Sequence, residues 1–238
     1  MRPGLLVTAE QVAQIAQVVA SYKERLETAK RLSANLLRLF TSDRLTPLVH
    51  SMNARAKDPG HLEDKLERKA DKCNRSGNQF DITPENLFEK INDLAGVRLL
   101  HLHTTQFKAI NEVVLELLSD EGYRVLEGPM ARIWDHEYER TFGAMGIDTT
   151  PSERMYTSVH YVVEPGAKTK RTAEIQVRTL AEELWGEVDH SLNYPHSCGI
   201  PVCEEQIKVL ARMTSSCTRL VDSIFFSKDE AQKVGGKK

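Results

Sequence analysis

Three polar side chains with strand spacing, Glu174, Gln176 and Arg178, carry the strongest chemical signal in this chain. Side chains alternate across a β-strand, so these three share one face while Ile175 and Val177 share the other. The apolar pair can pack on a core. A carboxylate and a guanidinium on the opposite face need a ligand, a metal or each other. The pattern therefore predicts an interior strand with one chemical face.

A second carboxylate, Asp93, precedes residues 95–98 (AGVR), where Gly96 permits close backbone approach at the start of another predicted strand. Taken alone, Asp93 is an ordinary cap or turn residue. Beside Glu174 it becomes half of a carboxylate pair, and hard divalent ions that handle phosphates bind one or two carboxylates plus substrate oxygens. The pair is a candidate Mg²⁺ site, and Glu174 is also a candidate base for an attacking hydroxyl.

Basic residues form a further candidate site earlier in the chain. Arg55 and Lys57 are followed by Lys65, Arg68 and Lys69, the last three on or close to one face of a predicted helix. Converging cations make a polyphosphate clamp. Acidic residues interleave with them, however, and taken alone the run is more typical of a solvated helix face.

Tyr156, Ser158 and His160 share one face of another predicted strand. An aromatic ring beside polar groups suits base stacking and phosphate contact. Taken alone, this trio is better explained by an ordinary sheet tyrosine and a satisfied core histidine. We interpret His101 and His103 as structural, because no Cys, Asp or Glu at zinc-like spacing accompanies them.

The elements that must position these residues alternate between helix and strand. Capping boxes at Thr8/Gln11 and Thr179/Glu182 predict two helix starts. Periodicity and turn residues predict helices over 8–40, 61–74, 83–93, 106–119 and 202–226, strands over 48–56, 95–103, 123–134 and 156–163, and a polar loop over 135–155.

The interleaving predicts an α/β fold with a mixed β-sheet of about five strands flanked by helices. We expect an N-terminal helical extension (1–44), a central domain (45–195) and a C-terminal helix and tail (196–238). The terminal helices could also pair with another subunit in a homo-oligomer.

Composition narrows the class of protein. The 238 residues are 40% hydrophobic and 28% charged, as in soluble globular proteins. A net charge of −2 gives no bulk attraction to nucleic acid. The N-terminus matches neither a signal peptide nor a membrane span. Four cysteines without a CxxC pair indicate a reduced, cytoplasmic protein.

In chain order, these motifs resemble the synthetase domain of the RelA/SpoT family, from about residue 48 to 195. The resemblance rests on Arg55-x-Lys57, Lys65, run 93–98 (DLAGVR), Tyr156-x-Ser158-x-His160, and the block from 174–179 (EIQVRT) to 190–194 (HSLNY). Members of that family transfer pyrophosphate from ATP to the 3′-hydroxyl of GDP or GTP and so make alarmones. The resemblance implies a nucleotidyltransferase-like fold. No hydrolase domain precedes the motifs, so we expect a small, stand-alone synthetase.

The resemblance also implies a role for each matched residue. On the ATP side, two arginines would flank adenine and two lysines would bind the phosphates: Arg55 and Arg98, then Lys57 and Lys65. Mg²⁺ would be held by Asp93 and Glu174. On the acceptor side, Tyr156 would stack on the base and His160 would contact phosphates or ribose. The acceptor side would be completed by Gln176 and Arg178.

Some positions depart from the family pattern, chiefly on the acceptor side. His61 and Thr157 replace a usual Ser and a usual Arg or Gln, and residues 151–156 (PSERMY) lack the Lys, Asn and Gly of the usual run. Two alternatives follow. The same chemistry could act on an adenosine nucleotide or the tRNA 3′ end, using the cations of 65–75. Alternatively, the chain is a non-catalytic nucleotide-binding relative.

Overall fold

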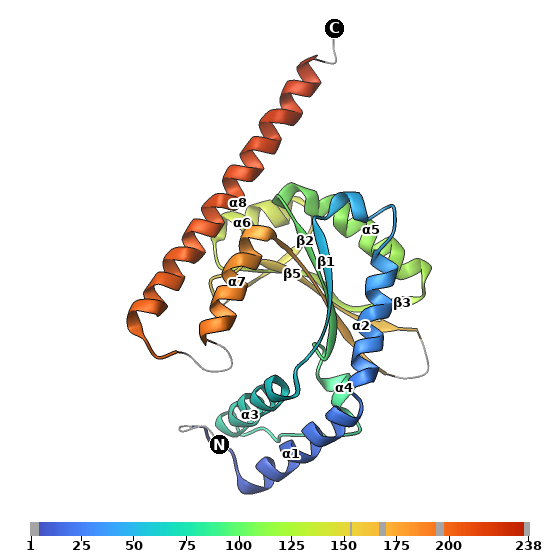
Figure 1. The fold of residues 1–238 in the computed structure, drawn as a ribbon, viewed down its shortest axis with the longest axis vertical. Coiled ribbons are helices and arrows are strands. Elements are labelled where there is room, and N and C mark those ends of the chain that lie inside the picture. The colour runs from blue at the N-terminus through green and yellow to red at the C-terminus, as the bar shows by residue number, and fades with distance from the viewer. Residues whose placement is uncertain (1–4, 153, 167–169, 194–197, 236–238) are drawn as a thin grey trace.

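The computed structural model describes residues 5–152, 154–166, 170–193 and 198–235, and its centre is one mixed six-stranded sheet (Figure 1). The strand order is β1 (Ser51–Ala56), β2 (Ala95–His101), β6 (Ala173–Thr179), β5 (Ser158–Pro165), β3 (Tyr123–Ile133) and β4 (Asp148–Pro151). Strands β2 and β6 run parallel, as do β3 and β4, and the other neighbours are antiparallel. The predicted α/β class is confirmed, with one strand more than expected.

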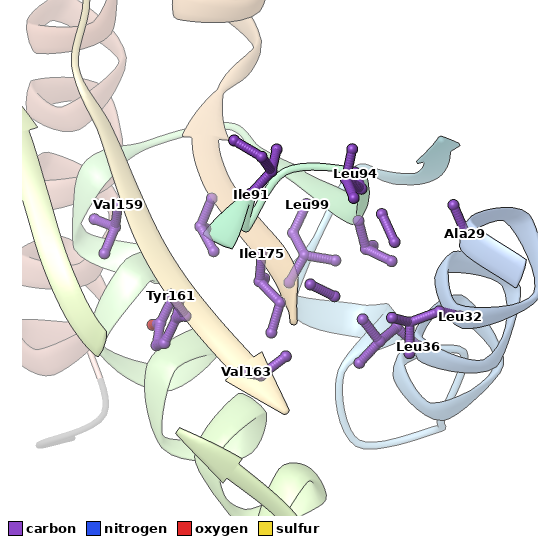
Figure 2. Packing of buried hydrophobic residues seen from close by; sticks show 14 of the residues in the cluster. Ala29, Leu32, Leu36, Ile91, Leu94, Leu99, Val159, Tyr161, Val163 and Ile175 are labelled. Atoms are coloured by element: carbon purple, nitrogen blue, oxygen red, sulfur yellow. The ribbon is translucent and has the colours of Figure 1, made fainter. Parts of the chain in front are cut away.

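The predicted division of β6 into two faces is correct. Ile175 and Val177 are buried, and they belong to an apolar layer that includes Leu99 and Tyr161 (Figure 2). Helices α2 (Leu26–Phe40) and α5 (Phe107–Asp120) cover this layer, because their own buried stripes belong to the same cluster. Burial of such side chains is the main favourable term in folding, so this face anchors the sheet.

The opposite face collects the polar residues through strand register. Arg55 pairs with Gly96, Gly96 with Glu174, and Arg98 with Gln176. Neighbours in register point to the same side of a sheet. The register therefore gathers residues from three strands that lie far apart in the sequence, between residues 51 and 179.

The N-terminal segment forms two helices instead of the single one predicted over 8–40. The capping box of Thr8 and Gln11 opens α1 (Ala9–Glu24), and the helix breaks at Arg25 before α2. The break lets α1 pack on α3 (Pro59–Arg75) while α2 packs on the sheet. Tyr22 donates a hydrogen bond to the Lys57 carbonyl (2.8 Å), and Ser33 donates one to the Arg55 carbonyl (2.6 Å).

The predicted loop over 135–155 contains a helix, α6 (His136–Ala144), and the edge strand β4. Asp135 caps α6 by accepting a hydrogen bond from the Glu137 amide (3.1 Å). Tyr138 and Phe142, one turn apart, are buried against the core. Two apolar residues among charged neighbours give too weak a period to predict so short a helix.

Two other helices differ in extent from the prediction. The helix predicted over 83–93 shrinks to α4 (Leu87–Lys90). Helix α7 (Leu180–Asn193) follows β6 directly, and α8 (Pro201–Gly235) is longer than expected and extends away from the fold (Figure 1). Short 3₁₀ turns occupy Thr46–Leu48 and Thr104–Gln106. All four cysteines are free in the structure. Among the described helices, none combines the length and apolar character needed to cross a bilayer.

Candidate active site

A cleft of about 750 Å³ opens over the polar face of the sheet, between α3 and α7. It brings together eight of the ten residues predicted from the sequence: Arg55, Lys57, Lys65, Asp93, Arg98, Tyr156, Gln176 and Arg178. The other two, Glu174 and His160, lie on the same sheet face but do not line the cleft.

The cleft is strongly basic although the whole chain carries a net charge of −2. Ten Lys and Arg side chains line it, against three acidic ones. Four of the ten, Lys65, Arg68, Lys69 and Lys72, come from α3, whose opposite face is buried through Leu62, Leu66 and Ala70. This part of the charged run is therefore more than a solvated surface. Concentrated positive charge in a concave site attracts polyanions such as polyphosphates.

Asp93 lies between two lysines at one end of the cleft. Its carboxylate oxygens are each 2.8 Å from an ammonium nitrogen, Oδ2 from Lys57 and Oδ1 from Lys65. Burial alone would raise the pKa of Asp93, but the two cations outweigh it and hold that pKa well below its usual range. Asp93 is therefore a permanent anion at neutral pH.

Glu174 is held just beneath the cleft. Gln176 Nε2 donates to its Oε2 (2.8 Å), and His160 Nδ1 lies 2.8 Å from its Oε1. Burial raises the pKa of Glu174, as does the charge of Asp93, but the hydrogen bonds from His160 and Gln176 bring it below its usual value. Glu174 is thus a partly buried anion within electrostatic reach of Asp93.

His160 is a buried, satisfied histidine in this structure. Its Nε2 lies 2.5 Å from Ser158 Oγ, while Nδ1 faces Glu174. It is 6% exposed, so it contacts Glu174 and not the open cleft. His101 is likewise structural: Nδ1 lies 2.9 Å from the His103 carbonyl, and burial lowers its pKa to about 4.

Arg98 and Arg178 share acidic partners on α7 that the sequence did not reveal. Arg98 Nη1 lies 2.5 Å from Glu183 and 2.8 Å from Glu187, and Arg178 also pairs closely with Glu183. Arg178 is buried, and this burial together with the charge of Arg98 lowers the pKa of its guanidinium. The acidic side chains keep two adjacent arginines side by side in the cleft wall.

Tyr156 is half of an aromatic pair. Its ring stacks on Trp185, with centroids 5.9 Å apart and planes inclined by 14°. Trp185 is buried, and its indole Nε1 donates to the Ile207 carbonyl of α8 (3.1 Å). Helix α8 therefore supports one wall of the cleft. Nearby, Arg154 lies 3.4 Å from Asp189.

The protein-family model described as a region found in RelA and SpoT proteins matches residues 54–198 of this sequence. The chain belongs to the RelA/SpoT family. It is 24% identical to the GTP pyrophosphokinase YjbM of Bacillus subtilis (strain 168) over 226 residues, which cover 92% of this chain and 91% of YjbM. It is 28% identical to the GTP pyrophosphokinase YwaC of the same organism over 160 residues, 65% of this chain and 62% of YwaC.

Solved structures of two small alarmone synthetases share the fold. Small alarmone synthetase 1 from Bacillus subtilis, bound to its product pppGpp, superimposes with a TM-score of 0.54 at 22% identity, covering 92% of this chain and 99% of that one. Small alarmone synthetase 2 from the same organism gives a TM-score of 0.56 at 22% identity, with coverage of 88% and 98%.

Two family positions lie outside the described residues, Tyr194 and Glu153 of the 151–156 run. Arg132 is a cleft residue that sequence reasoning missed. It lies on β3, and its register with Ser158 turns it toward the same sheet face as Arg98 and Arg178. Only the pairing of β3 with β5 reveals this position.

A divalent metal ion fits the carboxylates of the site only in company with a substrate. Within the described ranges, no three His, Cys, Asp or Glu side chains form a metal-holding group. Asp93 and Glu174 are two hard oxygen ligands, both anionic, in a cleft that suits phosphates. That donor set matches Mg²⁺, which commonly takes its remaining ligands from substrate oxygens and water.

Proposed function

We propose that this chain is a Mg²⁺-dependent pyrophosphokinase that transfers pyrophosphate from ATP to the 3′-hydroxyl of GDP or GTP, forming a (p)ppGpp-type alarmone. The supporting observation is the convergence of Arg55, Lys57, Lys65, Asp93 and Arg98 on one basic cleft. Two relatives named GTP pyrophosphokinase, YjbM and YwaC, add support.

The cations of α3, β1 and β2 form the ATP side in this proposal. Arg55 and Arg98 flank the adenine ring, and Lys57 and Lys65 bind the phosphates. Phosphoryl-type transfer depends mainly on positioning and charge neutralisation. Asp93 already holds Lys57 and Lys65 close to the position in which they would bind the phosphates. This limits the conformational entropy that the two side chains lose when phosphate binds.

Asp93 and Glu174 hold Mg²⁺ in the proposed enzyme. The ion would neutralise phosphate charge and orient the transferred group. Glu174, with its depressed pKa, is anionic at neutral pH and is also our candidate for the base that accepts the 3′-hydroxyl proton. His160 would act through Glu174, because its Nδ1 faces that carboxylate.

Tyr156 provides the stacking platform for the acceptor base, with its other face against Trp185. Gln176 and Arg178 complete the acceptor side, and Arg132 adds a further cation. This arrangement leaves one face of the tyrosine ring for a base, and stacking on an aromatic ring accepts any base. The identity of the acceptor therefore depends on the polar groups around it.

The test is incubation with labelled ATP, Mg²⁺ and GDP or GTP. We expect labelled pyrophosphate in the product, AMP release, and loss of both when EDTA removes the metal. Glu174→Gln should abolish transfer while leaving the circular dichroism spectrum intact. Glu27→Gln, an exposed change on α2, is the matched control and should retain activity. Full transfer by Glu174→Gln would exclude the proposed role of Glu174.

A second candidate keeps the chemistry and changes the acceptor to an adenosine nucleotide or the tRNA 3′ end. The cations Lys69 and Lys72 favour it, because they extend the basic lining of the cleft along α3. A panel of GDP, GTP, ADP, ATP and deacylated tRNA separates these acceptors. Nucleotide binding in calorimetry with no transfer to any of them would instead favour a non-catalytic binding relative.

We also propose that α8 contributes to a homo-oligomer. Large apolar side chains are exposed along it: Val202, Val209, Met213, Leu220 and Ile224. An exposed stripe of this kind is typical of helix pairing. Light scattering of the purified chain measures the oligomeric state. A monomer at micromolar concentration would contradict the proposal.

A further inference from the structure

A small cavity lies behind the acceptor side of the cleft, near the N-terminus of α7. Its volume is about 20 Å³, which is room for one water molecule. Part of its wall is apolar, from Phe107, Phe142 and Val159. The remainder is polar and includes Glu182 and Thr157. A cavity of this size with several polar walls is the kind that holds an ordered water molecule.

Four buried oxygen atoms of residues that line this cavity have no hydrogen-bond partner within the described residues. They are Glu182 Oε1, Thr157 Oγ1, Thr104 Oγ1 and the Tyr138 hydroxyl, on residues that are between 2% and 6% exposed. Buried polar atoms are nearly always hydrogen-bonded, to protein or to ordered water. Four such atoms around one water-sized space make it a suitable binding site for a shared polar partner.

Glu182 is connected to the acceptor side by its other carboxylate oxygen. Oε2 accepts a hydrogen bond from the backbone amide of Thr157 (3.0 Å). The predicted capping box is therefore only half formed. Thr179 Oγ1 accepts from the Glu182 amide (3.2 Å), but the Glu182 carboxylate reaches across to Thr157. Thr157 directly follows Tyr156, so Glu182 fixes the backbone next to the stacking ring.

We propose that a single structural water occupies this cavity and bridges Glu182 Oε1 to the hydroxyl groups of Thr157 and Thr104, making Glu182 a positioning residue for Tyr156. The donors and acceptors balance. The water donates one hydrogen to the carboxylate, and each threonine hydroxyl can donate to the water or accept from it. Thr157 is then held twice, through its amide and through its side chain.

The competing state is a dry cavity with a neutral Glu182. Burial raises the pKa of Glu182 to about 7, despite the hydrogen bond from Thr157 and the charge of Arg178. A protonated carboxyl group could satisfy itself by donating to a nearby hydroxyl. The two states differ in whether an atom fills the cavity, which a diffraction experiment decides without any measurement of activity.

The first test is a crystal structure of the full chain at a resolution that shows ordered waters. We expect one density peak within hydrogen-bonding distance of Glu182 Oε1, Thr157 Oγ1 and Thr104 Oγ1. An empty cavity, or a side chain that fills it, would overturn the water site. This readout stays valid even if the chain has no pyrophosphokinase activity.

The second test measures positioning, and it rests on the proposed acceptor role of Tyr156. Glu182→Ala removes the bond to the Thr157 amide and should raise the KM for the acceptor roughly tenfold, with little change in kcat or in the KM for ATP. Glu182→Gln keeps an oxygen for that amide and should stay within about twofold of the wild type. Equal losses for both substrates, or no loss, would overturn the positioning role.

Thr157→Val is a second variant in case Glu182→Ala fails to fold by circular dichroism. It removes one hydroxyl at nearly constant volume and keeps the amide that Glu182 binds. We expect a rise of about threefold in the acceptor KM and a loss of the water peak or of its bond to residue 157. An unchanged KM and an unchanged water would overturn the bridge. If the wild type itself transfers nothing, the proposed function fails and the diffraction test still decides the water.

Discussion

Gly96 and Glu174 pass so closely across the β2–β6 ladder that no side chain fits between them. A Cβ atom on Gly96 would lie 2.5 Å from the Glu174 carbonyl oxygen and 3.8 Å from its Cβ. The nearest atom belongs to the backbone, so it cannot rotate away as a flexible side chain could. Glu174, the proposed metal ligand, can therefore occupy this position only because residue 96 is a glycine and has a hydrogen atom in place of a Cβ atom.

Gly96→Ala should push β2 away from β6, displace Glu174 and destabilise the chain by about 1–3 kcal/mol, as overpacking typically does. Urea unfolding followed by circular dichroism measures the loss. Gly143→Ala is the control, because its Cβ would meet nothing within 4 Å in α6. That change should be neutral or stabilise by up to about 1 kcal/mol. Equal unfolding midpoints for the two variants would contradict the close contact.

Asp93 should make the stability of this chain depend on pH. Its native pKa is depressed below the unfolded value of about 4, so its contribution is present above pH ~4 and is lost as the pH falls. Lys57→Met removes one of its two cations and should destabilise by about 1–3 kcal/mol at pH 7. The penalty should shrink steadily below pH ~4 as Asp93 takes up a proton.

Lys30→Met is the matched control for this series, since Lys30 pairs with Glu27 on the exposed side of α2. It should change the free energy of unfolding by less than about 0.5 kcal/mol at every pH. Urea titrations at several pH values between about 3 and 8 compare the two variants, because this range spans the carboxyl pKa of about 4 in the unfolded chain. A Lys57→Met penalty that does not vary with pH would contradict the coupling to Asp93.

Glu183 should matter far more to stability than Glu187, although both contact Arg98. Glu183 is 17% exposed and pairs with the buried Arg178 and the partly buried Arg98, whereas Glu187 is 59% exposed. Glu183→Gln leaves buried positive charge poorly compensated and should cost about 2–4 kcal/mol. Glu187→Gln should cost less than about 1 kcal/mol. Chemical denaturation ranks the two, and the reverse order would refute the network as described.

Replacing the stacking ring should affect one substrate only. Tyr156→Phe keeps the ring against Trp185 and should leave the acceptor KM within about threefold, while Tyr156→Leu should raise it by about tenfold or more, as loss of base stacking does. The KM for ATP should not move. Steady-state kinetics with each substrate varied in turn measures both constants. A parallel rise in both would argue against an acceptor platform.

Local patterns in the sequence predicted those features that depend on neighbouring residues. The alternation over 174–178 identified both faces of β6, and Thr8 with Gln11 located the start of α1. Partnerships between distant segments were not predictable. Arg132 reaches the cleft only through the register of β3 with β5, and Glu183 meets Arg98 only because α7 folds back over β2.

His160 shows a different limit of sequence reasoning. Its place on the strand face was predicted correctly, yet strand alternation does not tell how deep a residue lies. In the structure its ring is buried between Ser158 and Glu174. The structure shows a contact with Glu174, the proposed metal ligand, and the acceptor contact implied by the family resemblance stays a prediction. Burial depends on which elements cover a strand, and no single strand encodes that.

The hydrogen bonds from Tyr22 and Ser33 come from helices that precede the family match, which begins at residue 54. They fix the carbonyl groups of Lys57 and Arg55, and Ser33 also accepts from the Gly96 amide (3.1 Å). A fragment trimmed to the matched residues would keep every motif. It would lose the side chains of Tyr22 and Ser33, which form hydrogen bonds to the backbone of Lys57, Arg55 and Gly96. The stretch that the family model matches is therefore shorter than the stretch that must be inherited together to hold these cleft residues in place.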